Sequence, residues 1–414
     1  MYHPAVVRAR LTQIADYTRT FDPTFTFRDY SLGQVEEWIA RLDTLYDEEK
    51  GVLRRGLNPD EERFVYHEIN KAKADATYWL THYGWIKTKA QTLSRITLLE
   101  SQEIALRTIA ARELECVRQP GGDGIVLMIL KARQLGMSTL VEGLISHRVF
   151  FYPYTGALVA ADVPTQSAYL FDMLERFHAN LPWWMKPART HHVKDQEMYF
   201  GDLDTLILVQ SGKSTRGGAT LGLERGQMGR GQTWPLFHGS ELSTWENPDQ
   251  IDDSLMPSIP ETPLTLAVFE STGRGRGNWW HDAWLAARKG VGRRRPVFIP
   301  WYAERHTYSR PAPSSWSPSP LALAHAAKVL ETSARWCGRS VTLNRDQLYW
   351  WEMTRADYAE RKKLHLFLAE YAADDLEAFQ ATSLSVFPHD TINEQRQMAR
   401  PTAGLVEFRP RMGA

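Results

Sequence analysis

The sequence predicts an α/β fold, in which a mostly parallel sheet is flanked by helices, with a helical region before it and a helical subdomain after it. Short apolar runs of strand length alternate with segments whose apolar residues recur at helical spacing, which is typical of parallel strands joined by crossover helices. Hydrophobic residues make up 43% of the 414 residues, enough for a large packed core.

The candidate strands lie in the middle of the chain. The clearest is the run 125–130, which is continuously apolar and follows a glycine-rich turn, as expected for a buried central strand. Shorter apolar runs predict the other strands, at residues 157–161, 206–209, 236–237, 264–269 and 297–299.

Helical spacing of apolar residues marks the segments on either side of these runs. We expect helices at 36–46, at 59–76, from Ser138 onward, around Leu170–Leu181, at 321–330 and at 345–371, with a Pro- and Ser-rich loop at 309–320. The chain therefore divides into four parts: a helical N-terminal appendage (1–84), a core domain (85–305), a helical subdomain completing it (306–388) and a linker or tail (389–414).

Composition excludes several classes of protein. Lys and Arg together number 49, as do Asp and Glu, so no strongly basic domain is present, although a local basic stripe can hide in a neutral total. Cys116 and Cys337 match no metal-binding spacing and suit a reducing cytosol. The first residues lack the apolar stretch of a signal peptide, and no run is long enough for a bilayer. We expect neither secretion nor a membrane.

A tight loop follows the 125–130 strand and leads into a helix. It reads Lys-Ala-Arg-Gln-Leu-Gly-Met-Ser-Thr, residues 131–139. Where a strand, a tight loop and a helix follow one another in this way, the loop N–H groups and the positive end of the helix dipole can bind phosphates. Gly136 permits close approach of the backbone, and the Ser138 hydroxyl is the candidate Mg²⁺ ligand.

This loop departs from the usual G-x-x-x-x-G-K-[ST] pattern. Lys131 stands at the first glycine position, and Met137 stands at the lysine position, where it cannot contact phosphate electrostatically. The cation must come from elsewhere, and Lys131 or Arg133 is nearest. Alternatively, Ser138 is only a helix N-cap, Gln134 only fills the loop, and both cations lie on the surface.

A second motif ends the short strand near residue 237. Ser240 and Glu241 follow it directly, and Glu241 is our candidate for the carboxylate that polarises a water for attack on a γ-phosphate. Ser240 occupies the place where an Asp often holds the water shell of Mg²⁺. His238 is interpreted as a core histidine rather than a site residue.

A third motif follows the 264–269 strand. Ser271 and Thr272 stand beside a Gly/Arg loop and could sense a γ-phosphate and transmit its loss. Arg274 and Arg276 could contact phosphate, DNA or a neighbouring subunit, or simply belong to a solvated basic loop.

These three motifs, in this order, resemble the ATPase domain of phage large terminase subunits, a P-loop NTPase (RecA-like, ASCE) fold. The resemblance rests on residues 131–139, 237–245 and 270–280. It implies an adenine-contacting glutamine at Gln102 and a hydrolytic phosphate-loop arginine at Arg133. It also implies phosphate and metal contacts by Lys131, Gln134, Gly136, Met137, Ser138 and Thr139, a catalytic Glu241, and a coupling segment at Ser271, Thr272 and Arg274.

The resemblance also implies a function. Large terminases are ATP- and Mg²⁺-dependent motors that package double-stranded DNA, docked as a ring on the portal protein of a procapsid in the host cytoplasm, with a small terminase subunit. Such chains usually continue into a nuclease, and we expect none here because no apolar strand carrying an Asp follows Phe387. The alternatives are another helicase-like or transposition-related P-loop ATPase, or a non-hydrolytic assembly protein with a degenerate ATPase fold.

Overall fold

The computed structural model describes residues 30–118, 124–211 and 232–380, apart from residues 247 and 250. The predicted tail at 389–414 and the first 29 residues of the predicted N-terminal appendage lie outside the described residues. Within the described part, the α/β fold expected from the sequence is confirmed.

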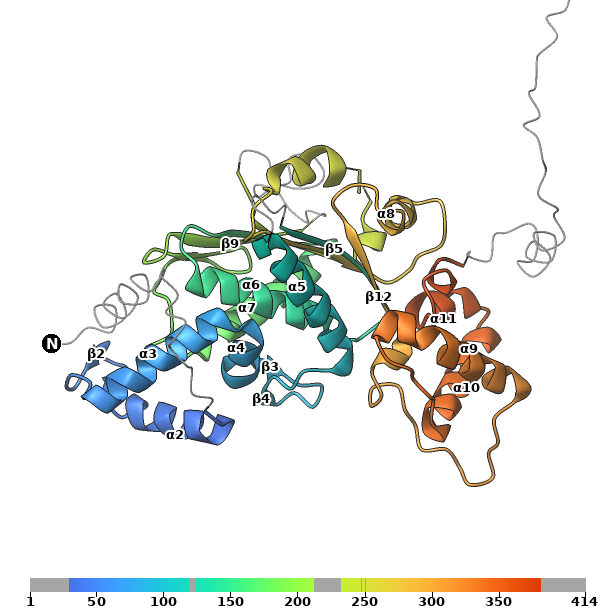
Figure 1. The fold of residues 1–414 in the computed structure, drawn as a ribbon, viewed down its shortest axis with the longest axis horizontal. Helices are drawn as coiled ribbons and strands as arrows, with labels where there is room; N and C mark the ends of the chain where they lie inside the picture. Colours follow the sequence, from blue (N-terminus) through green and yellow to red (C-terminus); the bar gives the residue numbers. More distant parts are fainter. Residues whose placement is uncertain (1–29, 119–123, 212–231, 247, 250, 381–414) are drawn as a thin grey trace, which may run out of the picture.

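The core is an eight-stranded sheet in the order β12-β5-β11-β10-β6-β9-β8-β7 (Figure 1). Six of these strands are parallel, from β12 through β9, while β8 and β7 join as an antiparallel edge. The strand bounds are β5 Ile125–Lys131, β6 Gly156–Ala161, β7 Arg189–Val193, β8 Glu197–Phe200, β9 Thr205–Ser211, β10 Leu236–Ser240, β11 Leu266–Ser271 and β12 Arg295–Ile299.

Each predicted strand is present, with shifted ends. The β10 strand extends through Ser240 rather than ending at residue 237, and β11 begins at Leu266 rather than at Leu264. The β7–β8 hairpin is not predicted by the sequence. Polar residues dominate β7, which is exposed throughout, so it lacks the apolar run that reveals the buried strands.

Both faces of the sheet are buried. Alternate residues of β5 point into two separate cores: Ile125, Leu127 and Ile129 into one, Val126, Met128 and Leu130 into the other. Figure 1 shows helices α5 (Glu100–Arg118), α6 (Met137–Phe151) and α7 (Pro164–Ala179) on the first face and α8 (Trp279–Arg288) on the second. Two-sided burial explains why these strands are apolar without alternation.

The N-terminal helices pack on the first face of the sheet. They are α2 (Leu32–Asp43), α3 (Pro59–Ala74) and α4 (Ala76–Tyr83), with the short hairpins β1–β2 (Tyr46–Asp47, Val52–Leu53) and β3–β4 (Trp85–Lys87, Leu93–Arg95). Asp75 ends α3 and caps α4 by accepting from the Tyr78 N–H, so the predicted helix 59–76 is in fact followed by a second helix. The buried residues of α3 and α4 belong to the same core as α6 and α7.

Helices α9 (Pro320–Cys337), α10 (Arg345–Glu360) and α11 (Leu364–Glu370) lie beside the β12 edge of the sheet (Figure 1). The segment 345–371 is helical, as predicted, but it forms two helices, because the chain breaks between α10 and α11, where Lys362 adopts a left-handed backbone with φ +56°. Among the described residues, no helix has the length and apolarity needed to cross a membrane.

Candidate functional site

The loop between β5 and α6, the predicted phosphate loop, contains two residues with a left-handed backbone. Gln134 and Gly136 both have positive φ, +55° and +70°. Gly136 is the N-cap of α6, so the alternative that Ser138 only caps the helix is wrong. In the described residues, no backbone–backbone hydrogen bond takes up the N–H groups of Gln134, Leu135 or Gly136. Free N–H groups at a helix N-terminus attract anions.

Helix α5 is hydrogen-bonded to this loop. The side-chain amide of Gln102 donates to the Gly136 carbonyl at 2.7 Å, and the Ser101 hydroxyl donates to the Leu135 carbonyl at 3.1 Å. Gln102 also accepts from the Leu99 N–H at 2.9 Å and is almost fully buried. Gln102 thus contacts the loop itself, and its predicted contact with an adenine ring stays a prediction.

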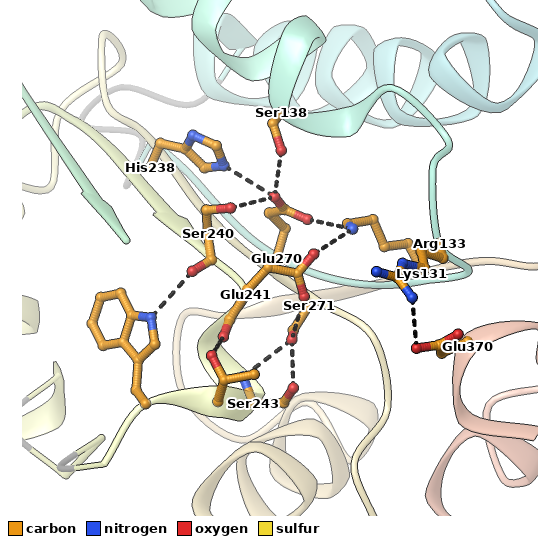
Figure 2. A network of polar contacts seen from close by, with 12 residues as sticks. Lys131, Arg133, Ser138, His238, Ser240, Glu241, Ser243, Glu270, Ser271 and Glu370 are labelled. Carbon is orange, nitrogen blue, oxygen red and sulfur yellow. Dashed lines mark hydrogen bonds and ion pairs between the residues drawn. The ribbon is translucent and has the colours of Figure 1, made fainter. Parts of the chain in front are cut away.

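Lys131 is the central cation of the site (Figure 2). Its Nζ lies 3.1 Å from Glu241 Oε1 and 3.1 Å from Glu270 Oε2. Burial by itself lowers the pKa of Lys131, but the two carboxylates outweigh it and hold the pKa above its usual value. The ammonium is therefore charged and lies at the start of the loop. Met137, at the other end of the loop, supplies no charge.

Glu241 directly follows β10 in a left-handed backbone, with φ +54° and ψ +43°. For a residue with a side chain this conformation costs about 1–2 kcal/mol, and strain of this kind is concentrated at functional sites. The side chain is 26% exposed. One oxygen contacts Lys131 and the other accepts from the Ser271 hydroxyl at 3.4 Å. Glu241 is thus a fixed carboxylate with an open side.

Glu270 is the site residue that sequence reasoning missed. It ends β11, is fully buried, and accepts hydrogen bonds on Oε1 from the hydroxyls of Ser138 at 2.8 Å and Ser240 at 3.0 Å (Figure 2). Burial raises its pKa, but Lys131 and His238 more than offset this, so its pKa lies well below the usual value. The sequence signal that could have identified Glu270 is the position of a charged residue at the end of an apolar strand.

His238 is buried, as interpreted from the sequence, but it joins the polar network. Its Nδ1 lies 2.7 Å from Glu142 Oε1, and its Nε2 lies 3.5 Å from Glu270 Oε1. Burial lowers the pKa of His238, but the two carboxylates outweigh this effect and raise the pKa to about 9. His238 therefore carries a charge that helps to offset the buried Glu270.

Arg133 does not point at Glu241. Its guanidinium lies 2.9 Å from Glu370 Oε1 at the end of α11, and its backbone N–H donates to the Glu370 carbonyl at 2.9 Å (Figure 2). The Tyr358 hydroxyl, from α10, donates to the other Glu370 oxygen at 3.0 Å. The loop is thereby tied to the C-terminal helices.

The other predicted residues of the loop lie around this centre. The Met137 side chain is buried in the core, so only its backbone is available to a ligand. The Thr139 hydroxyl lies 3.9 Å from the Met173 sulfur. The Gln134 side chain accepts from Lys89 at 3.3 Å.

The three residues of the predicted coupling segment differ in burial and in their contacts. Ser271 is buried and its hydroxyl lies 2.8 Å from the Ser243 hydroxyl, whereas Thr272 is half-buried and Arg274 is exposed. Gly273 lies directly against the backbone of Ala378, where a Cβ atom would overlap the carbonyl. Ser271 thus connects to the strand end that carries Glu241, while Arg274 does not join the network in Figure 2.

The residues present suit an ATP–Mg²⁺ complex. Among the described residues, no group of three or more His, Cys, Asp or Glu side chains is arranged to hold a metal ion. Magnesium seldom needs one, because it is usually held by one or two protein oxygens together with substrate phosphates and water. Ser138, Glu241 and Glu270 offer such oxygens beside free loop N–H groups.

A separate hollow of about 1960 Å³ lies on another part of the molecule. It is bordered by α2, the hairpins β1–β2 and β3–β4, and α7, and no residue of the phosphate loop lines it. Its lining includes both acidic and basic side chains, among them Asp43, Arg54, Glu175 and Arg189. The polar network around Lys131, rather than this hollow, carries the candidate chemistry.

Comparison with known proteins finds likeness in structure only. No family model and no curated protein matches the chain. The HK97 bacteriophage large terminase is 13% identical with a TM-score of 0.46, over 73% of this chain and 55% of that one. A mutant of the Thermus phage P74-26 large terminase ATPase domain is 13% identical with a TM-score of 0.37, over 63% and 92%. This chain thus spans about half the length of the HK97 protein.

Proposed function

We propose that this protein is the ATP-hydrolysing motor of a viral DNA-packaging machine, a large terminase ATPase that moves double-stranded DNA into a procapsid. The observation that carries the proposal is the meeting of Lys131, Ser138 and Glu241 at one edge of the parallel sheet. Lys131 ends β5 and Glu241 follows β10, while Glu270, at the end of the intervening strand β11, contacts both Lys131 and Ser138. Ligands of open α/β sheets bind at this edge. The three ordered motifs of the sequence give the proposal its substrate.

In this proposal each group has one role. Free N–H groups of the loop and the N-terminus of α6 bind the β- and γ-phosphates, and Lys131 exchanges a carboxylate for a phosphate oxygen. Glu241 accepts a proton from the attacking water, which its open side can admit. Ser138 is the hydroxyl that would hold Mg²⁺, which supplies charge neutralisation on the phosphates. Arg133 leaves Glu370 to reach the transferring phosphate.

The remaining roles and partners belong to the same proposal. Ser271 and Thr272, with Arg274, couple hydrolysis to motion, and Gln102 contacts the adenine. Residues 85–305 form the motor core and 306–388 its helical subdomain. The partners are double-stranded DNA, a portal protein, a small terminase subunit and further copies of this chain in a ring, in the host cytoplasm.

Replacement of one carboxylate tests the proposal. In Glu241→Gln we expect ATP turnover, measured with double-stranded DNA and portal protein, to fall by about 10²–10⁴-fold, because a general base is lost. ATP affinity, measured by fluorescence titration, should change little. Glu261→Gln, at an exposed carboxylate before the amino end of β11, is the matched control and should retain turnover.

Other results would point to the alternatives. Nucleotide binding without phosphate release, in the wild type and in Glu241→Gln alike, would favour a non-hydrolytic assembly protein. Strand separation of a duplex driven by ATP would favour a helicase-like enzyme. Absence of both binding and turnover would end the proposal.

A further inference from the structure

We infer that Glu270, on β11, supplies the metal-orienting carboxylate that β10 lacks because Ser240 stands in its place. The inference rests on the proposed function, since the metal concerned is the Mg²⁺ of a bound nucleotide. It adds a residue that none of the three sequence motifs assigned to the site.

The strand end of β10 carries only one carboxylate. Glu241 is there for the water, but the preceding position, where an Asp often orients the water shell of Mg²⁺, is occupied by the uncharged Ser240. The Ser240 hydroxyl is buried and donates to Glu270 Oε1 at 3.0 Å. The Ser240 hydroxyl is therefore hydrogen-bonded to the carboxylate of the neighbouring strand β11.

The sheet register explains how a neighbouring strand can provide the missing group. In the parallel pair β10–β11, Ser240 stands directly opposite Glu270. Adjacent strands lie about 4.8 Å apart, and a glutamate reaches one methylene further than an aspartate. A carboxylate moved by one strand can thus reach the same place, with the longer side chain making up part of the distance.

Ser138 places this carboxylate at the metal side of the site. Its hydroxyl is the group that the proposed function assigns to Mg²⁺, and it donates to the same Glu270 oxygen at 2.8 Å. Glu270 Oε2 instead faces Lys131 at 3.1 Å. The Glu270 side chain therefore contacts the Ser138 hydroxyl, the strand end of β10 and the Lys131 ammonium.

The cost of burying Glu270 argues for a function. A fully buried carboxylate costs several kcal/mol of desolvation, and an apolar residue of similar size would fit a sheet buried on both faces more cheaply. Glu142 and His238 form a buried chain of charged side chains behind Glu270. Such supporting groups are typical around residues that orient a metal.

The test measures how much Mg²⁺ strengthens nucleotide binding. Affinity for a fluorescent ADP is titrated once with Mg²⁺ and once with EDTA, and the ratio of the two gives the metal-dependent gain without turnover. We expect Glu270→Gln to lose about 10–100-fold of this gain. Because the substitution also frees Lys131, the affinity in EDTA is compared separately.

A carboxylate moved back to β10 makes the test decisive. In the double variant Ser240→Asp with Glu270→Gln, the charge returns to the strand that normally carries it, and the gain should be largely restored. Glu270→Asp, which keeps the charge that pairs with Lys131, should lose only part of the gain. Glu61→Gln is the control: it removes a buried carboxylate on α3 that pairs with Arg41 and Arg55, outside this network, and should keep the gain.

Each outcome bears on the inference. A folded Glu270→Gln that retains the full gain overturns it, as does a folded double variant that binds ADP in EDTA but gains nothing from Mg²⁺. If Glu270→Gln does not fold, the double variant and Glu270→Asp decide by the same measurement. If wild-type protein binds no nucleotide at all, the proposed function fails instead, so the two failures are distinguishable.

Discussion

Lys131 stands where the usual phosphate-loop pattern has a glycine, and in the proposed function its charge replaces the lysine charge that Met137 lacks. From the start of the loop its ammonium reaches two carboxylates on two other strands. The sequence offered Lys131 and Arg133 as equal candidates for the cation. Tertiary contacts separate them, because Arg133 turns to α11 while Lys131 turns inward.

Removal of the Lys131 charge should destabilise the fold. In Lys131→Met, Glu270 stays buried beside fewer cations, and we expect the free energy of unfolding in urea to fall by about 3–5 kcal/mol. In the double variant with Glu270→Gln, most of this loss should be recovered, since the fully buried carboxylate is gone and Glu241, which also loses Lys131, is partly exposed to water. Equal, additive losses from the two substitutions would show that the charges do not interact.

Glu241 and Glu270 show how far the role of a residue can be predicted from the sequence. Glu241 follows a short strand with the motif around it, so it was predicted. Glu270 was passed over because Ser271 and Thr272 beside it drew the interpretation. Its importance depends on register with Ser240 and on contact with Ser138, and neither is visible before the strand order is known.

At the scale of elements, the apolar runs predicted the parallel strands because burial on both faces leaves a strong, local signal. The edge hairpin β7–β8 and helix α5 were not predicted. Strand β7 is exposed along its whole length, and α5 was noted only for its glutamine. The strand order, which brings three motifs to one edge, also required the structure.

The packing of α6 against α3 predicts a pH dependence. His147 on α6 is buried and its Nε2 lies 2.8 Å from the Ala72 carbonyl. Burial lowers its pKa from 6.5 to about 4. Between these values the unfolded chain binds the extra proton, so this contribution to stability is present above pH 6.5 and is lost as pH falls towards 4. At about 1.4 kcal/mol per pKa unit, the loss is on the order of 3 kcal/mol.

The measurement is the free energy of unfolding at a series of pH values. His147→Gln keeps a hydrogen-bond donor but does not titrate, so its stability should fall less steeply than that of the wild type between pH 6.5 and 4.5. His191→Gln, at an exposed histidine, should show the wild-type slope. Identical slopes for the wild type and His147→Gln would contradict the assignment.

At the scale of the molecule, the C-terminal helices and the phosphate loop are connected through Arg133, Glu370 and Tyr358. The sequence placed Arg133 in the loop but gave no sign of its partner, since Glu370 lies 237 residues further along. If nucleotide binding draws the Arg133 guanidinium away, its ion pair with Glu370 at the end of α11 is broken at the same moment. This is a direct route from the site to the helical subdomain.

The connection predicts opposite effects for its two ends. In Glu370→Gln, Arg133 is freed, and ATP should bind up to about fivefold more tightly, the value of an ion pair worth about 1 kcal/mol. In Arg133→Ala, binding should weaken. The free energy of unfolding should change by less than about 1 kcal/mol in both, because the Arg133 side chain is 55% exposed. Weaker ATP binding in Glu370→Gln would show that Glu370 acts in another way.

The claim on which everything else depends is that the triphosphate lies between the 131–139 loop and Glu241. The structure of the protein with Mg²⁺, ADP and beryllium fluoride tests it most directly. The account predicts that the β-phosphate contacts the N–H groups of residues 134–138 and that the beryllium fluoride lies between Lys131 and Glu241. Nucleotide bound elsewhere, or with its phosphates turned away from Glu241, would contradict it.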